Sequence, residues 1–500
     1  MRLRSFLLLS VALAAPASAE TLRDALAKAY QNNPTLTAQR AAQRANDENV
    51  PIARAGGRPV VSANTGINEN FIRSGNNFTT PERLLQGNVG VTLPLYQGGR
   101  VRNGVQAAEI RVGAGQANLR GVEANTFTDV VGAYNNVIRD EAIVGLNAQN
   151  VRVLETNLRA SRDRFEVGDL TRTDVAQSEA RLALARAQLQ GAQATLIASR
   201  ENYVRLVGAA PGTLDQPPAL PALPASADDA VTVALRDNPT LLAARELRRA
   251  SDYDVRVAQA GRLPQVGVTV GQNYVNYLGT LGAGTGLGVG QTGSSTAVGL
   301  SLSLPIFQGG RPAAQIRQAQ ELRGQAIEQA TATERQVIAS TRSAYAIWRS
   351  SLQVIASAET AVNANKLSLE GVRAENSVGT RTILDILNAE QELLNSQVTL
   401  VTARRDAYVA GFALLAAMGH AEARDLGLDG GALYDPTTHY RDVRGRFSDF
   451  DGGKAAQPVA GSTANTPAQD ANVTRPLDPL LESNVDRTPA LTTGIDRPRP

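Results

Sequence analysis

Cysteine is absent from the 500 residues of this sequence, and histidine occurs only twice, as His420 and His439. Without thiols the chain cannot form a cysteine-ligated zinc site, a disulfide scaffold, an iron–sulfur cluster or a thiol nucleophile. A serine–histidine–aspartate triad would need one of two histidines near the C-terminus, which argues against a hydrolase. The composition therefore predicts a protein that is not an enzyme and that uses no metal and no cofactor.

An excess of charge of one sign is also missing. Fifty basic and 47 acidic residues give a formal net charge of +3. Loss of Arg2 and Arg4 with the export signal described next would lower this charge from +3 to +1. Aromatic residues make up only 4% of the chain and are not interleaved with basic residues in any patch. The sequence therefore predicts no binding of nucleic acid.

Long hydrophobic runs are missing as well, because no stretch after residue 19 reaches the 18 apolar residues that a transmembrane helix needs. The first nineteen residues instead have the parts of an export signal. Two arginines precede the apolar residues 6–15, and residues 17–19, Ala-Ser-Ala, form a small-x-small cleavage site. We therefore expect a signal peptide over residues 1–19. No cysteine follows the apolar run, so no N-terminal lipid anchor is expected.

The chain contains an internal repeat. The tetrapeptide Asn-Pro-Thr-Leu occurs at 33–36 and again at 238–241, and the octapeptide at 93–100, Leu-Pro-Leu-Tyr-Gln-Gly-Gly-Arg, returns at 304–311 as Leu-Pro-Ile-Phe-Gln-Gly-Gly-Arg. The second offset, 211, also relates five later pairs: Tyr134 and Tyr345, Gly168 and Gly379, Asp174 and Asp385, Glu179 and Glu390, and Gly208 and Gly419. A constant offset indicates structural repeats, which we place at residues 20–209 and 226–420, joined by a proline-rich linker, 210–225.

The hydrophobic period changes twice within each repeat. It is helical over 20–57, with a break at Asn33-Pro34. It becomes two in the expected hairpins, about 60–93 and 265–304, where apolar residues alternate with small or polar ones. It then returns to a helical period, with apolar residues seven apart that favour a left-handed supercoil: Val130, Val137, Val144, Val151, Leu158 and Phe165.

The expected order in each repeat is thus helix, hairpin, long helix, turn and returning helix. The long helix of the first repeat, 101–167, would span ~100 Å at 1.5 Å per residue. The returning helices are expected at 169–208 and 380–419.

Isolated hairpins would leave their edges unpaired in water. Alternating apolar and small or polar residues in an exported protein are typical of outer-membrane strands, which must close into a barrel. Four strands per chain are too few, so we expect a trimer with about twelve strands, continued by a periplasmic tube of helices. The fold class predicted is mainly α with a transmembrane β-barrel part. The alternative is a periplasmic coiled-coil scaffold or adhesin that conducts nothing.

The repeat, the two junctions Pro-[Leu/Ile]-[Tyr/Phe]-Gln-Gly-Gly-Arg and residues 377–387, Ser-Val-Gly-Thr-Arg-Thr-Ile-Leu-Asp-Ile-Leu, resemble the TolC family of outer-membrane efflux and type I secretion channels. The resemblance covers roughly residues 20–447. It implies a homotrimeric channel in outer-membrane lipid that extends into the periplasm. It also implies docking onto an inner-membrane ABC or RND pump through a periplasmic membrane-fusion adaptor. The missing lipid-anchoring cysteine fits the secretion branch better than the lipoprotein efflux branch.

Candidate functional residues lie where each long helix turns back. Gly168 and Gly379 are placed to take the left-handed conformation that ends a helix. Asp174 and Asp385 each follow a turn glycine by six residues, which puts their carboxylates on the first turns of the returning helices. In a trimer each aspartate would form a ring of three.

The resemblance implies a role for each of these positions. Those that match Asp174 and Arg381 keep the tunnel entrance shut, the one that matches Asp385 belongs to a constricting acidic ring, and the turns at Gly168 and Gly379 dock the adaptor. Two positions depart from the family pattern. Asn376 replaces an aromatic gate partner and Asn388 replaces a second acidic ring position, which predicts a looser gate and a less charged ring.

The repeat ends near residue 420. Residues 421–450 resemble the family's segment on the outside of the tunnel. Residues 451–500 are rich in Pro, Thr, Ala, Asp and Gly, with few large apolar side chains. We therefore expect a disordered tail over 451–500.

Overall fold

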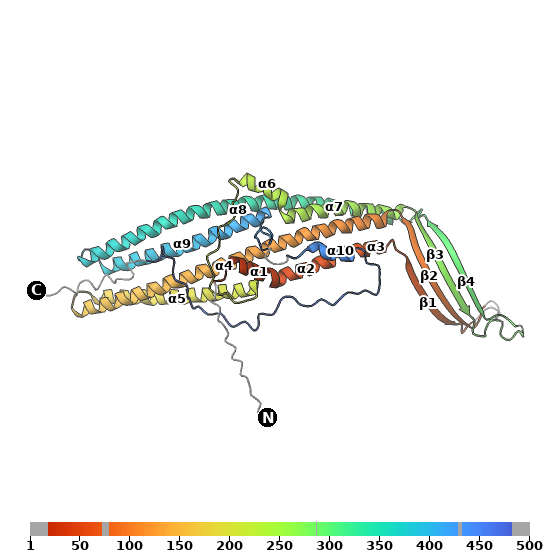
Figure 1. Ribbon diagram of the computed structural model, residues 1–500, viewed down its shortest axis with the longest axis horizontal. Coiled ribbons are helices and arrows are strands. Elements are labelled where there is room, and N and C mark those ends of the chain that lie inside the picture. Colours follow the sequence, from red (N-terminus) through yellow and green to blue (C-terminus); the bar gives the residue numbers. More distant parts are fainter. Residues whose placement is uncertain (1–18, 73–79, 287, 429–432, 483–500) are drawn as a thin grey trace, which may run out of the picture.

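The computed structural model describes residues 19–72, 80–286, 288–428 and 433–482. All but the last residue of the expected signal peptide lies outside the described residues. The described chain is elongated, with a bundle of helices at one end and a four-stranded sheet at the other (Figure 1).

Each repeat begins with helices that are broken at an Asn-Pro step. In the first repeat these helices are α1 Leu22–Asn32, α2 Pro34–Asp47 and α3 Asn49–Ala55. Asn33 ends α1, and its side-chain oxygen caps α2 by accepting from the amide of Thr35 at 2.9 Å. Its side-chain amide donates to the carbonyl of Leu206 at 2.9 Å, which ties the break to the end of the repeat.

The second repeat is also broken at an Asn-Pro step, but a single helix follows the break in place of α2 and α3. Its helices are α6 Ala227–Asp237 and α7 Pro239–Gln259, followed by a short 3-10 turn, Ala260–Arg262. Asn238 caps α7 and donates to the carbonyl of Ala417 at 2.9 Å. The predicted helix break is therefore confirmed in both copies.

The long helices are α4 Arg100–Glu166 and α8 Arg311–Ser377, each of 67 residues. They return as α5 Arg172–Val207 and α9 Ile383–Met418, each of 36 residues. The start and the end of each pair differ by the offset of 211 found in the sequence. At 1.5 Å per residue the long helices span ~100 Å. Because the returning helices are shorter, α2, α3 and α7 pack along the remaining length near the sheet.

The four strands form one antiparallel sheet in the order β1 Val60–Glu69, β2 Arg83–Gln97, β3 Gln265–Asn276 and β4 Thr292–Ser303. Pairing of β2 with β3 joins the two repeats in this sheet. The first hairpin extends further than the expected 60–93, because β2 continues through Pro94 to Gln97 with a register shift between Pro94 and Tyr96. A bulge accommodates the proline, which cannot donate a ladder hydrogen bond.

The register gives the sheet two faces of different chemistry. One cross-strand row contains Val61, Val91, Val270 and Val298, and a row on the opposite face contains Asn64, Asn88, Asn273 and Ser295. The side chains of Asn88 and Asn273 are hydrogen-bonded at 2.6 Å. The apolar face is exposed in the single chain, where Val298 is 74% accessible. Within the described residues β1 and β4 each pair on one side only.

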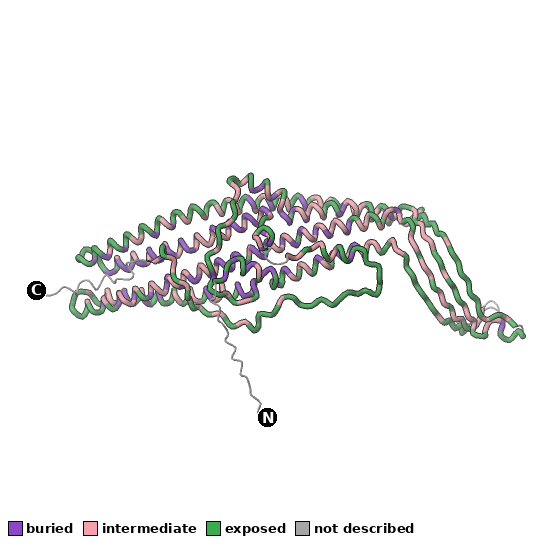
Figure 2. The backbone as a smooth tube through the Cα atoms, in the orientation of Figure 1, coloured by how far each residue is buried: buried purple, intermediate pink, exposed green. Residues whose placement is uncertain are grey.

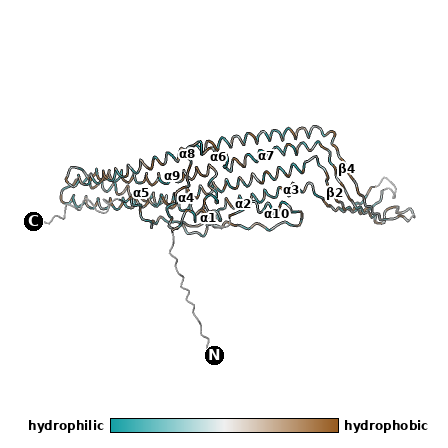
Figure 3. Tube along the Cα trace, turned by 45° about the horizontal axis from the view of Figure 1, so that its top comes forward, coloured by the Kyte–Doolittle hydropathy of each residue, from teal (hydrophilic) through white to brown (hydrophobic). Residues whose placement is uncertain are grey.

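The buried core follows the middle of the helical bundle, whereas the sheet is mostly exposed (Figure 2). At its centre the hydroxyl of Tyr134 lies 2.9 Å from the carbonyl oxygen of Glu20 and 2.8 Å from that of Asp215. The start of the first repeat is thereby held against the linker between the repeats. Hydrophobic and hydrophilic residues are interspersed along the long helices (Figure 3). None of the described helices contains an apolar stretch of the length needed to span a membrane.

The C-terminal region differs in part from the expectation. After α10 Pro436–Val443, which packs against α2, the chain runs in an extended path along the helices. Residues 451–500 were expected to be disordered, but over 469–482 the structure shows specific contacts with the bundle. Leu481 is only 2% exposed, and Asp478 pairs with Arg404 at 2.8 Å. A few anchoring side chains hold this segment to the helices, and average composition does not reveal such contacts. Residues 483–500 lie outside the described residues.

Candidate functional site at the helix tips

Both long helices end in the same turn at the end of the bundle far from the sheet (Figure 1). Gly168 has a φ of 83° and Gly379 a φ of 80°. In the first turn the amide of Gly168 donates to the carbonyl of Phe165 at 3.0 Å, and the amide of Asp169 donates to that of Arg164 at 2.8 Å. This pair of bonds is a Schellman motif, which satisfies the last carbonyls of the helix and requires a left-handed residue.

Asp174 and Asp385 lie on the first turns of the returning helices, as the spacing predicted. Each is the third residue of its helix and completes a capping box with the threonine before the helix. In the second repeat Thr382 donates to a carboxylate oxygen of Asp385 from its amide at 2.9 Å and from its hydroxyl at 2.7 Å. The hydroxyl bond lowers the pKa of Asp385 below its ordinary value, so the carboxylate is ionised at neutral pH.

Arg381 has a partner that the sequence reasoning missed. Its Nε donates to Oε2 of Glu375 at 2.8 Å, and both side chains are about half exposed. This ion pair raises the pKa of Arg381. It also bridges the turn between α8 and α9 within a single chain. The described residues show no hydrogen bond or ion pair between Arg381 and Asp174. The only sequence signal for the pair is a carboxylate six residues before the arginine, across the turn glycine.

The two asparagines that depart from the family pattern each make a specific hydrogen bond. Asn376 is buried and donates from its side chain to the carbonyl of Arg381 at 2.7 Å. Asn388 accepts from Nη2 of Arg181 at 2.7 Å, which links α9 to α5. Each asparagine therefore connects two parts of the tip through a hydrogen bond.

A buried polar cluster lies just above the tip. Glu390 on α9 accepts from Asn157 on α4 at 2.9 Å and from Arg373 on α8 at 2.9 Å. The side chains of Arg373 and Glu390 are 7% and 5% exposed. The equivalent residues of the first repeat, Arg162 and Glu179, pair at 2.6 Å but are 56% and 50% exposed. The spacing of Glu179 and Glu390 marks them as equivalent positions of the repeat but does not indicate that only Glu390 is buried.

The chemistry available at the tip is that of exposed charges held at helix ends. No group of three or more histidine, aspartate or glutamate side chains in the described part of the chain is arranged to hold a metal ion. The carboxylates of Asp174 and Asp385 are negative charges held in place by the capping boxes on the first turns of α5 and α9.

Comparison with known proteins agrees with this architecture. Residues 25–209 and 230–420 match the family described as "Outer membrane efflux protein", one match for each repeat. The outer membrane efflux protein BepC of Brucella suis is 37% identical over 433 residues, which cover 86% of this chain and 92% of BepC. The outer membrane protein TolC of Escherichia coli is 30% identical over 348 residues, covering 67% of this chain and 68% of TolC.

The same fold is found among solved structures. The crystal structure of the outer membrane protein VceC of Vibrio cholerae superposes with a TM-score of 0.68 at 23% identity, over 80% of this chain and 96% of VceC. The family match covers both repeats, and the resemblance to the TolC family is confirmed. The chain therefore belongs to the outer membrane efflux protein family and is an export channel of the outer membrane.

Proposed function

We propose that three copies of this chain close into one channel, with about twelve strands in the outer membrane and the long helices as a periplasmic tunnel. The observation that carries the proposal is the four-stranded sheet with one apolar and one polar face, in which the outer edges of β1 and β4 pair with no other strand of the described residues. Neighbouring copies would pair these edges, turn the valine rows toward lipid, and turn the asparagine and serine rows toward an aqueous lumen.

The helix tips would meet a periplasmic membrane-fusion adaptor, which connects the tunnel to an inner-membrane ABC or RND pump. Support comes from the turns at Gly168 and Gly379, which present one apolar side chain each at equivalent positions. Val167 is 80% exposed and Val378 is 74% exposed. Exposed valines beside charged residues provide a small apolar contact with a polar rim, as protein–protein interfaces require.

Planar-bilayer recording of the purified protein tests this function, with Asp385→Asn as the informative variant. The wild type should form heat-modifiable trimers and open channels that prefer cations, because a ring of three carboxylates attracts cations and repels anions. Asp385→Asn should reduce the cation preference. The pKa of Asp385 is lowered, so the preference should persist as pH falls into the ordinary carboxyl range and disappear only below it. Non-conducting protein without trimers would favour a periplasmic scaffold or adhesin instead.

Arg381 and Asp174 would hold the tunnel entrance shut, and Arg381→Ser should raise the single-channel conductance. An exposed ion pair contributes only about 0–1 kcal/mol, but three copies in a ring would bias a marginal closed state.

Glu375→Gln is the matched control for the gate. It removes the negative charge that pairs with Arg381 at 2.8 Å within the same protomer, and so weakens the contact that competes with a neighbouring protomer for the arginine. Conductance should stay near the wild-type value in this control. A wild-type conductance in Arg381→Ser would contradict the gate assignment.

A further inference from the structure

The C-terminal residues 469–482, which we call the strap, cross the helical bundle. The strap begins on α5, where the amide of Gln469 donates to Glu201 at 3.0 Å and Asp470 pairs with Arg200 at 3.0 Å. Arg200 also donates to the carbonyl of Asn472 at 2.9 Å. Its side chain is 13% exposed, so this end of the strap is held by a well-packed guanidinium.

The middle of the strap lies on α4 and α9. Leu477 packs over Gly145 of α4 so closely that a Cβ at this glycine would lie 3.0 Å from the leucine Cδ2. Asp478 accepts from Arg404 of α9 at 2.8 Å. The absence of a side chain at Gly145 thus provides the space that Leu477 of the strap occupies on α4.

The strap ends on α9 and α8. Gln397 of α9 donates to the carbonyl of Leu481 at 2.7 Å, and Lys366 of α8 donates to the carbonyl of Leu480 at 2.6 Å. The side chain of Leu481 is buried in the apolar cluster that the four helices share, whereas Leu480 is 51% exposed. The strap therefore contacts both helices of each hairpin, α4 with α5 and α8 with α9.

The contact is oblique to the helices. Counted from the helix ends at 1.5 Å per residue, the strap lies about 40 Å from the tip at Arg200 of α5 and about 17 Å from it at Lys366 of α8. A segment fixed at both ends in this way resists any sliding or separation of one hairpin relative to the other.

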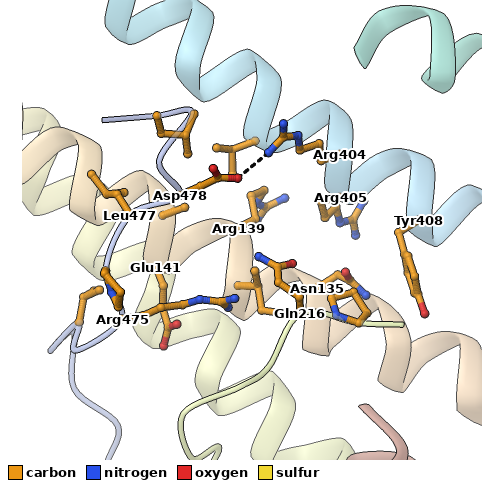
Figure 4. Close-up of a pocket in the computed structure, with 17 residues that line it drawn as sticks. Asn135, Arg139, Glu141, Gln216, Arg404, Arg405, Tyr408, Arg475, Leu477 and Asp478 are labelled. Carbon is orange, nitrogen blue, oxygen red and sulfur yellow. Dashed lines mark hydrogen bonds and ion pairs between the residues drawn. The ribbon is translucent and has the colours of Figure 1, made fainter. Parts of the chain in front are cut away.

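The packing under the strap is incomplete. A cavity of about 250 Å³ lies beneath it, bounded by α4, α9, the linker residues Gln216 and Pro217, and the strap residues Val473 and Arg475 (Figure 4). Nη1 of Arg475 is buried there without a hydrogen-bond partner. A buried guanidinium nitrogen without a hydrogen-bond partner and an unfilled space weaken the attachment of the strap relative to a solid core. Its attachment depends on a few polar contacts, on the packing of Leu477 over Gly145 and on the burial of Leu481, so it can be released without unfolding the helices.

We propose that the strap is a latch. It holds the two helical hairpins of each protomer, α4 with α5 and α8 with α9, together in the closed channel, and its release favours the open channel. This inference rests on the proposed function, because it assumes that the hairpins shift when the tunnel entrance opens. A ligand-free closed state stabilised by the strap would become less populated when the contacts with α8 and α9 are lost.

Releasing the latch is the first test. Leu481→Asp in the full chain, and a chain that ends at residue 468, should each raise the mean single-channel conductance roughly twofold or more. Leu480→Asp is the matched control, since it adds the same charge one residue away at an exposed position, and its conductance should equal that of the wild type. Wild-type conductance in both release variants would overturn the latch.

Locking the latch is the second test. Because the chain has no cysteine, within one protomer two introduced cysteines can form a disulfide only with each other. A Cβ at Gly145 would lie 3.4 Å from Cγ of Leu477, the atom whose place a cysteine sulfur would take, so Gly145→Cys with Leu477→Cys should form a disulfide. Oxidation should lower conductance, and reduction should restore it. Failure to cross-link, or cross-linking without effect, would contradict the proposal. Failure of the wild type to conduct at all would instead contradict the proposed function.

Discussion

Glu390→Ala should lower the free energy of unfolding by about 3–5 kcal/mol, because it removes one partner of a buried ion pair. Arg373 is 7% exposed and donates to Glu390 at 2.9 Å. Asn157 would lose its acceptor at the same time. The three residues come from α8, α9 and α4, so the loss would weaken the junction between the two hairpins as well as the fold of each one.

The first repeat supplies a matched control for this prediction. Glu179→Ala breaks the equivalent pair with Arg162, which is about half exposed on both sides and should cost only about 0–1 kcal/mol. Urea unfolding of the detergent-solubilised proteins, followed by far-UV circular dichroism, measures both losses. Equal losses for the two variants would contradict the conclusion that the pair of Arg373 and Glu390 is buried and the pair of Arg162 and Glu179 is not.

Val298→Arg should prevent the protein from accumulating as trimers in the outer membrane. Val298 lies in the middle of β4, on the apolar face, and is 74% exposed in the single chain. If this face meets lipid, an arginine near the bilayer midplane costs about 2–4 kcal/mol in each chain. The penalty would apply three times in one barrel, so its effect on assembly should be large.

Ala297→Arg is the control, since the neighbouring side chain points to the opposite face of the sheet. Its row contains Ser62, Gly90 and Gly271, which are small or polar and would line the lumen. The charge should be tolerated there, with trimers retained and conductance altered. Heat modifiability of outer-membrane fractions distinguishes the two variants, and loss of trimers in Ala297→Arg alone would mean that the two faces have been assigned the wrong way round.

Much of the fold could be predicted because its signals are local. The helix break at Asn33, the turn glycine Gly168 and the alternation around Val298 each depend on residues that are neighbours in the chain. Each signal recurs in the second repeat at an offset of 205 or 211, and the long and returning helices have equivalent ends in both repeats. The first β-hairpin continues past the expected residue 93 to Gln97, because a bulge accommodates Pro94 within the strand. The local preference for ending a strand at proline does not predict this bulge.

The candidate site could be predicted in position but not in its contacts. The spacing from Gly379 placed Asp385 on the first helical turn, where the structure has it. Glu375, the partner of Arg381, lies across the turn. Its contact with Arg381 depends on the direction in which its side chain points from the last turn of α8. The order of the strap over 469–482 was missed for a related reason, because Leu481 is buried by four helices that are remote from it in sequence.

The sequence by itself determined the repeat, the lengths of the helices, the turns at their tips and the two chemistries of the strands, since all of these follow from residue type and period. Only the tertiary structure decided which of two equivalent charged pairs is buried. Arg162 and Glu179 occupy the same helical positions as Arg373 and Glu390, but α9 packs against α4 in addition to its own partner α8. The third helix removes water from one pair and provides Asn157 to complete it, and burial by a distant segment leaves no mark on the local pattern.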